Sequence, residues 1–254
     1  MKAGSGLVND HFTADLRLSR ISSDGFINRA SSHLKSLHFS TAYIGKATTL
    51  RFNIFSGKEK TYQSWYGISE ADLKSGNRTI NYAGTEKPGE PYKNETDNYK
   101  QTHYQLFYNH QLPGQWKLNT AVFLTRGKGY YEQYKAGQKL ENYSLPDYWD
   151  GNSLIKKTDL IRRLWLDNYF YGTNFSLQNQ KENNQFIIGG GWNKYDGTHF
   201  GEMKWAQVKG AIPADHRWYD LKAYKNDFSL FTKWTEQWNN NWLSFFDIQF
   251  RSIG

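Results

Sequence analysis

Cysteine is absent from the sequence, and no apolar stretch approaches the length of a membrane-spanning helix. The missing thiols rule out disulfide bonds and thiolate metal sites. A spanning helix needs about 20 predominantly apolar residues, so helical membrane segments are excluded as well. Proline is scarce, and all five prolines fall between the patterned segments described below. Proline cannot donate to a β-ladder, so this placement is what a β-sheet protein requires.

Hydrophobic residues are also few, at 38%, against about 45–50% in typical globular domains. Aromatic residues nevertheless reach 17%, which suits amphipathic surfaces better than a thick apolar core. Acidic residues are outnumbered 24 to 32, giving a net charge of +8. Such a charge favours an anionic partner. Nucleic acid would serve in a soluble protein, and lipid headgroups or an anionic ligand would serve in a membrane barrel; we predict no nucleic-acid partner.

What the sequence does contain is strict alternation. In GQWKLNTAVFLT (residues 114–125), apolar residues occupy mainly the even positions, and polar residues such as Lys117, Asn119 and Thr125 lie between them. A period of two indicates a β-strand, because successive side chains point to opposite faces of a sheet. Alternation of this kind predicts nine strands, at residues 12–21, 35–44, 49–56, 99–110, 114–125, 163–178, 185–194, 224–234 and 242–252.

The connections between these segments alternate between long and short. Short turns are predicted at 45–48, 111–114, 179–184 and 236–241, and long loops at 57–98, 126–159 and 195–221. We therefore predict an all-β, antiparallel up-and-down meander that forms part of a transmembrane β-barrel, because such barrels have short turns at one end and longer loops at the other. The face of Trp116, Leu118, Val122 and Leu124 would meet lipid, where a lysine or arginine costs ~2–4 kcal/mol at the midplane. The other face would meet a watery lumen.

Three stretches carry a resemblance to a known family: GSGLVNDHFTADLRLSRISSDGFINRA, NETDNYKQTHYQLFYNHQL and FLTRGKGYYEQYK. They resemble the barrel of TonB-dependent outer-membrane receptors, particularly those of Bacteroidetes-type bacteria. The resemblance implies a 22-stranded barrel closed by a plug, and import of iron–siderophore complexes, haem, vitamin B12 or oligosaccharides. It also implies residence in the outer membrane of a Gram-negative bacterium, with lipid and lipopolysaccharide as partners.

The chain departs from the family pattern in three respects. Its start, MKAGSGLVNDHF, has no apolar signal region, and neither a TonB box nor a plug is recognisable. We therefore expect residues 1–254 to be an internal barrel fragment. A small nutrient is the expected ligand, most simply an iron–siderophore or haem-type complex, and TonB would engage only missing parts of the parent protein.

Aromatic-rich loops are the candidate ligand-binding sites, because Trp and Tyr combine a stacking face with a polar handle. Interfacial anchoring or loop packing would explain them equally well. On the lumen face, four polar residues are candidates for guiding an anionic solute. The candidates are Tyr62, Trp65 and Tyr66 in one loop, Tyr130, Tyr131 and Tyr134 in another, Trp205 and Trp218 in a third, and Arg17, His38, Arg51 and Asn53 on the lumen wall.

No catalytic or metal-binding role is predicted, and no cofactor. None of the seven histidines has the H-E-x-x-H spacing of a zinc protease, and His199 and Glu202 lie in a predicted loop. Two other classes stay open at this stage. A soluble carbohydrate-binding β-sandwich would use the same alternation to cover its core, and a small passive porin would need 8–10 strands that close on themselves.

Overall fold

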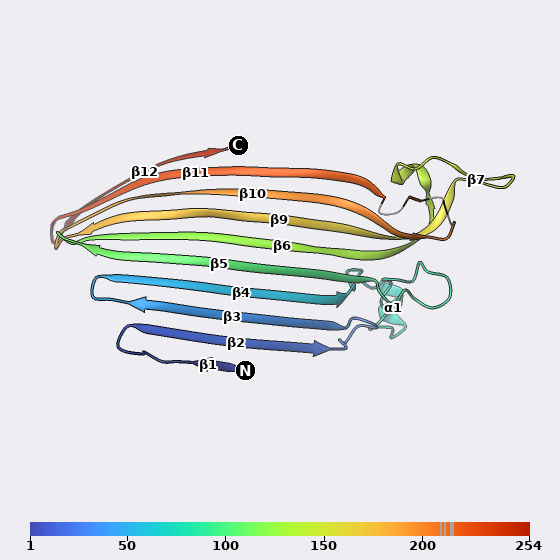
Figure 1. The fold of residues 1–254 in the computed structure, drawn as a ribbon, viewed down its shortest axis with the longest axis horizontal. Helices are drawn as coiled ribbons and strands as arrows, with labels where there is room; N and C mark the ends of the chain where they lie inside the picture. Colours follow the sequence, from blue (N-terminus) through green and yellow to red (C-terminus); the bar gives the residue numbers. More distant parts are fainter. Residues whose placement is uncertain (209, 211, 214–215) are drawn as a thin grey trace.

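The computed structural model describes residues 1–208, 210, 212–213 and 216–254. Its main element is one antiparallel sheet of ten strands that follow one another in chain order. Figure 1 shows the tight turns gathered at one end of the sheet and the longer connections at the other. The strands are β1 (Lys2–Gly4), β2 (Phe12–Ser23), β3 (Ser32–Ile44), β4 (Thr48–Tyr62), β5 (Thr96–Leu112), β6 (Trp116–Lys139), β9 (Lys157–Gln180), β10 (Asn184–Ala206), β11 (Arg217–Asn239) and β12 (Trp242–Ile253).

Several small elements lie at the end of the sheet that has the long connections. Helix α1 (Glu70–Lys74) lies between β4 and β5, and a 3-10 turn (Leu140–Tyr143) precedes a separate hairpin of β7 (Tyr148–Asp150) and β8 (Ser153–Ile155). Among the described residues, no helix is both long enough and apolar enough to cross a membrane.

All nine predicted strands and the antiparallel meander are confirmed, and β1 adds a short tenth strand. The three predicted long loops are wrong in extent, and the one at 57–98 shrinks to 63–95. The loop at 126–159 shrinks to 140–156, and that at 195–221 shrinks to 207–216, since β6, β9, β10 and β11 run past the alternating segments. Residues 209, 211, 214 and 215 of the latter lie outside the described residues. Alternation ends at residue 125 although the backbone ladder continues, because beyond that point the two faces no longer differ in polarity.

The pairing register sorts the side chains into two faces. Directly paired residues point to the same side of a sheet, so a row can be followed across neighbouring strands. One such row is Phe12–Tyr43–Leu50–Tyr108–Thr120–Phe175–Gly190–Leu230–Phe250. We call this side of the sheet, which also carries Val122 and Leu124, the apolar face, and the opposite side, with Asn119 and Thr125, the polar face.

Side chains on the apolar face are exposed, whereas side chains on the polar face are buried or contact one another. Val122 is 51% exposed and Phe250 60%, but Ser40 and Thr125 on the polar face are buried. Polar-face side chains bond across strands: the Ser40 hydroxyl donates to Asn53 Oδ1 (2.7 Å), and Thr125 Oγ1 lies 2.9 Å from His103 Nδ1. Nearer the long connections, residues 63–95 bury Tyr62 and Glu132 on the apolar side. From the tight turns to the row of Leu124, no second layer of described residues covers the apolar side of the ten-stranded sheet. This arrangement is the reverse of a soluble protein, in which the apolar set is the buried one.

Glycines on the polar face make room for aromatic rings. Gly129 is paired with Tyr99 of β5, and a Cβ built on Gly129 would lie 2.2 Å from the Asn98 carbonyl oxygen and 2.6 Å from Tyr99 Cδ2. Gly201 lies in the same way beneath the indole of Trp218. The glycine-rich stretch after residue 125 is therefore a strand whose missing side chains are replaced by rings from its neighbours.

A methyl group at Gly129 should consequently destabilise the sheet. We expect Gly129→Ala to lower the free energy of unfolding by roughly 1–3 kcal/mol, because the clash involves neighbouring backbone that cannot rotate away. Denaturant unfolding of the full encoded chain in detergent micelles, followed by tryptophan fluorescence, measures this. Gly57→Ala is the matched control, since nothing lies within 4 Å of its Cβ position; equal stability of the two variants would contradict the packing role.

Candidate ligand-binding site

A groove opens on the polar face near the long connections. Two successive cross-strand rows supply its walls: Asp97–Tyr131–Leu164–Gly201–Tyr219 and Glu59–Tyr99–Gly129–Leu166–His199. The groove has a volume of about 370 Å³. Three tyrosine rings, one imidazole and two carboxylates thus face one space. Such a surface offers aromatic faces for stacking and hydroxyl and carboxylate groups for hydrogen bonding.

The connection between β4 and β5 (residues 63–95) is fixed by Arg29. The Arg29 guanidinium donates from Nη2 to the carbonyl oxygens of Asn81 and Ala83, at 2.5 and 3.0 Å, and its Nε lies 3.3 Å from the Tyr62 hydroxyl. Tyr62 in turn donates to the Tyr92 carbonyl oxygen at 2.7 Å. Tyr62 is the last residue of strand β4, not a loop residue as predicted. It is buried and anchors this connection, and its hydroxyl is already engaged.

Glu132 ties the same connection to the sheet. Its side chain is only 4% exposed. Oε1 accepts from the Tyr92 hydroxyl (2.6 Å) and from Asn94 Nδ2 (2.5 Å), and Oε2 accepts from Arg163 Nε (2.6 Å). Burial raises the pKa of the Tyr92 hydroxyl well above its ordinary value, and the hydrogen bond to the Glu132 carboxylate raises it further. This hydroxyl therefore stays protonated and remains a donor.

Glu95 provides a second attachment. Its Oε2 accepts from the Tyr134 backbone N–H at 2.9 Å. Burial raises the pKa of the Glu95 carboxyl, although that hydrogen bond opposes the shift. Elsewhere in the connection, the Ser69 and Tyr82 hydroxyls donate hydrogen bonds to the Asp72 carboxylate. These bonds hold the pKa of Asp72 below its usual range. Several independent attachments therefore hold this connection against the end of the sheet.

Trp65 is the residue that this anchoring brings to the groove. Its ring meets that of Tyr131 edge to face, with centroids 5.3 Å apart and an interplanar angle of 79°. Trp65 remains 57% exposed and Tyr66 47% exposed. Trp65 and Tyr131 therefore form an aromatic pair with free ring surface at the rim of the groove.

The other predicted aromatic residues are dispersed. Tyr130 and Tyr131 are neighbours in β6 and point to opposite faces, so the predicted grouping of Tyr130, Tyr131 and Tyr134 in one loop is wrong. Tyr130 lies on the apolar face with its ring 4.5 Å from that of Trp165. Tyr134 is buried, donates to Asp159 Oδ2 and stacks on Trp205, with centroids 6.2 Å apart. Trp205 lies in a strand as well.

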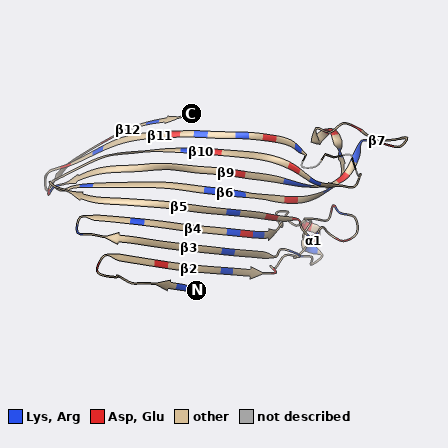
Figure 2. Cartoon of the chain, viewed as in Figure 1, with Lys and Arg blue, Asp and Glu red and all other residues tan. Residues whose placement is uncertain are grey.

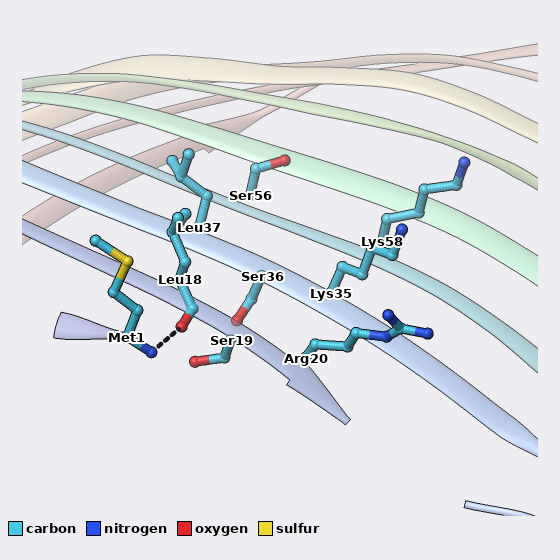
Figure 3. A pocket seen from close by; sticks show the side chains of 9 residues that line it. All are labelled: Met1, Leu18, Ser19, Arg20, Lys35, Ser36, Leu37, Ser56 and Lys58. Atoms are coloured by element: carbon cyan, nitrogen blue, oxygen red, sulfur yellow. Dashed lines mark hydrogen bonds between the residues drawn. The ribbon is translucent and has the colours of Figure 1, made fainter. Parts of the chain in front are cut away.

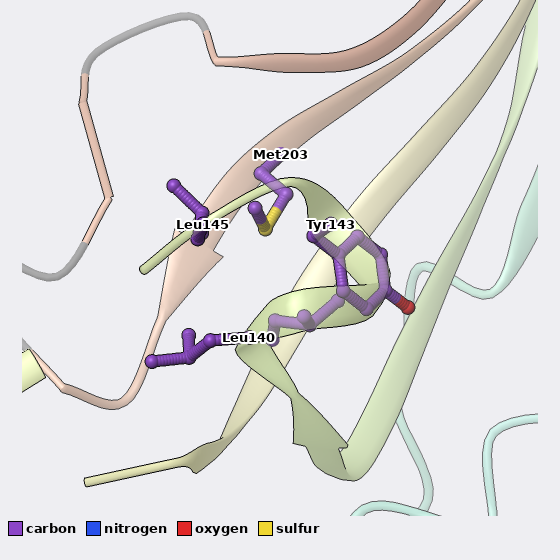
Figure 4. Close-up of a cluster of buried hydrophobic side chains, with 5 residues drawn as sticks. Leu140, Tyr143, Leu145 and Met203 are labelled. Carbon is purple, nitrogen blue, oxygen red and sulfur yellow. The ribbon is translucent and has the colours of Figure 1, made fainter. Parts of the chain in front are cut away.

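Trp218 packs against a small cluster of buried hydrophobic side chains at the same end of the sheet. Figure 4 shows the buried members of this cluster. Its ring lies 5.0 Å from that of Tyr143, and His216 Nε2 is 2.7 Å from the Tyr143 carbonyl oxygen. The cluster folds the connection between β6 and β9 onto the sheet. Trp218 is part of β11, not of a loop as predicted, and its ring packs within this cluster. The buried members are Leu140, Tyr143, Leu145, Leu160 and Met203.

The four predicted wall residues share the polar face, as expected. Arg17 of β2 is paired directly with His38 of β3, and Asn53 of β4 with Ser40. Arg51 is paired with Phe107 on the next strand. They lie nearer the tight turns than the groove does.

No metal centre is evident: the described residues contain no cluster of three or more potential histidine or carboxylate ligands. His199 and Glu202 lie in strand β10 instead of a loop. His199 faces the groove, whereas Glu202 accepts from Trp165 Nε1 (2.9 Å) on the apolar side. The two side chains cannot share an ion.

Comparison with known proteins places the fold. No family model and no curated protein sequence matches the chain. Solved structures do: the ferric-catecholate import receptor Fiu from E. coli K12 (TM-score 0.63, 13% identity), the ferric citrate transporter FecA (0.65, 14%) and BauA, the ferric preacinetobactin receptor from Acinetobacter baumannii (0.60, 10%). Each match covers 99% of this chain but only 43%, 34% and 38% of the respective receptor.

These neighbours are TonB-dependent outer-membrane receptors, so they are transport proteins and not enzymes. At such low identity the likeness concerns the fold: the chain is an all-β meander of the kind that builds outer-membrane β-barrels. In length it corresponds to less than half of such a receptor. The other sheet formed by the described residues is the two-stranded β7–β8 hairpin, so these residues do not form a two-layered β-sandwich.

The anchoring of residues 63–95 can be tested by proteolysis. Glu132→Gln removes the charge opposite Arg163 and places an amide N–H₂ group where the carboxylate accepted hydrogen bonds. We therefore expect the free energy that holds residues 63–95 to the sheet to fall by roughly 1–3 kcal/mol. Trypsin should then cut after Arg78 and Lys93, both exposed, several-fold faster. Glu70→Gln is the control, since Glu70 forms an exposed ion pair with Lys74. Unchanged cleavage of the Glu132 variant would show that the network does not hold the connection.

Proposed function

We propose that this chain is part of the barrel of a TonB-dependent receptor in the outer membrane of a Gram-negative bacterium. The receptor would bind and import a small ferric chelate of the siderophore or haem type. The bare apolar face carries this proposal. A single sheet with large hydrophobic residues on the outside is stable only where that side meets hydrocarbon, and the receptors with the same fold are import proteins.

The dimensions of the apolar face support a membrane position. The apolar rows run along β6 from Trp116 to Leu124, a length of ~27 Å at the usual rise per residue. At a tilt of ~40° this gives a band of roughly 21 Å, within a few ångströms of the ~25 Å of outer-membrane barrels. In those rows Lys194 is the only lysine, arginine or carboxylate among the described residues.

The groove on the polar face is the proposed place of first ligand contact. Long connections mark the extracellular end of such barrels, and the groove lies at that end. Trp65 and Tyr131 would stack on the aromatic or conjugated part of a chelate. Arg17 and Arg51, deeper along the polar face, would attract the anionic chelate inward. Energy for release would come from TonB through parts of the receptor outside these 254 residues.

Loss of the aromatic pair should weaken ligand binding. We expect the double substitution Trp65→Ala and Tyr131→Ala to raise the Kd roughly tenfold, since each stacked ring contributes ~0.5–1.5 kcal/mol. The measurement is tryptophan fluorescence quenching of the full encoded chain in detergent, titrated with ferric citrate, a ferric tris-catecholate and haem.

Trp242→Ala is the control, because Trp242 is exposed at the tight-turn end of the sheet. The proposal requires that at least one of the three chelates binds to the unmodified protein and to the Trp242 variant with the same affinity. Binding of none of them, or equal binding by the double variant, would contradict the proposed ligand class or the proposed site.

A further inference from the structure

Five cations form a continuous row across the apolar face. The register pairs Arg20 of β2 with Lys35 of β3, Lys35 with Lys58 of β4, Lys58 with Lys100 of β5, and Lys100 with Lys128 of β6. We call these residues the basic row. Figure 2 shows a basic segment at a similar position along each of the strands β2 to β6. Adjacent strands are about 4.8 Å apart, so this is a line of closely spaced like charges.

Such a row is unfavourable unless something neutralises it, because like charges directly opposite each other destabilise a sheet. The β6 end is neutralised within the chain: Lys128 Nζ lies 2.9 Å from Asp167 Oδ2, and Arg126 pairs with the same carboxylate. The other four cations are exposed and form no ion pair or side-chain hydrogen bond with any described residue.

Acidic residues of the nearby connection are engaged elsewhere. Glu70 pairs with Lys74, and Glu86 pairs with Lys135. Glu59, next to Lys58 in sequence, points to the opposite, polar face. The four exposed cations are therefore available to an anionic group from outside the described chain.

The position of the row identifies the chemistry of that partner. The row lies just beyond the rows that carry Leu18, Leu37 and Leu124, on the side of the long connections. A pocket of about 510 Å³ straddles the boundary (Figure 3). Leu18 and Leu37 line its apolar part, and Arg20, Lys35 and Lys58 line its cationic part. One surface thus offers hydrocarbon contact and cations side by side.

We propose that the basic row binds the phosphate groups of a phosphorylated lipid in the outer leaflet, with acyl chains lying on the adjacent leucines. This inference rests on the membrane placement of the proposed function. A free anion would use the cations but not the leucines, and a nonphosphorylated lipid would use the leucines but not the cations. A phosphorylated glycolipid of the lipid A type satisfies both.

The test compares the full encoded chain with a triple variant, Arg20→Gln, Lys35→Gln and Lys58→Gln. Native mass spectrometry in detergent measures binding of bisphosphorylated lipid A, of the same lipid A without phosphates, and of inorganic phosphate. The triple variant should bind phosphorylated lipid A roughly 100-fold more weakly, about fivefold for each cation near an anionic lipid surface. The dephosphorylated lipid should bind weakly to both proteins.

The matched control removes the same charge elsewhere: Lys46→Gln, Lys117→Gln and Lys181→Gln, all exposed and near the tight turns. This control should bind lipid A as the unmodified protein does. The proposal fails if the triple variant retains full affinity, if the dephosphorylated lipid binds equally well, or if inorganic phosphate displaces the lipid at equal concentration.

Two parallel measurements separate this proposal from the proposed function. The triple variant should still appear in the outer-membrane fraction and should bind the ferric chelate unchanged. If it does so while its lipid A binding is also unchanged, only the lipid site is refuted. If the unmodified chain is absent from the outer-membrane fraction, the receptor assignment is refuted as well.

Discussion

Backbone hydrogen bonding between strands is the constraint on which the rest of this structure depends. In hydrocarbon no water is available for a free N–H or C=O group, so each strand must pair along its whole spanning length. Continuous pairing fixes the register, and the register fixes which side chains share a face. The apolar face, the polar face, the groove and the basic row are all consequences of that one ladder.

The same ladder divides the sheet into zones along its length. Near the tight turns, one face is apolar and the other polar. Farther along, Arg126 and Lys128 replace apolar residues on one face while Gly127 and Gly129 replace side chains on the other. The strands do not end there; they continue toward the connections, where Tyr131 contributes to the groove and Glu132 holds residues 63–95 in place. In the proposed function, lipid contact and ligand contact thus come from successive segments of one strand.

The sequence was sufficient to predict the nine strands, their antiparallel order and the two faces, because a period of two depends only on neighbouring residues. It was insufficient beyond residue 125, where the alternation stops but pairing continues. The groove could not be predicted from the sequence. Its rings Tyr99, Tyr131 and Tyr219 belong to three strands, and only the register brings them together. Tyr130 and Tyr131 were grouped because they are adjacent, although adjacency in a strand means opposite faces. The basic row was not predicted either, because its members lie far apart in the chain and only the register brings them together.

The most direct test of the account is the solvent accessibility of consecutive residues in β6. The protein has no cysteine, so single cysteines at positions 120–125 can each carry a spin label in the full encoded chain in lipid bilayers. The account predicts that labels at Val122 and Leu124 collide with oxygen dissolved in the lipid, and that labels at Phe123 and Thr125 collide with a water-soluble nickel complex. Accessibility without this period of two, or with water at Val122 and Leu124, would contradict it.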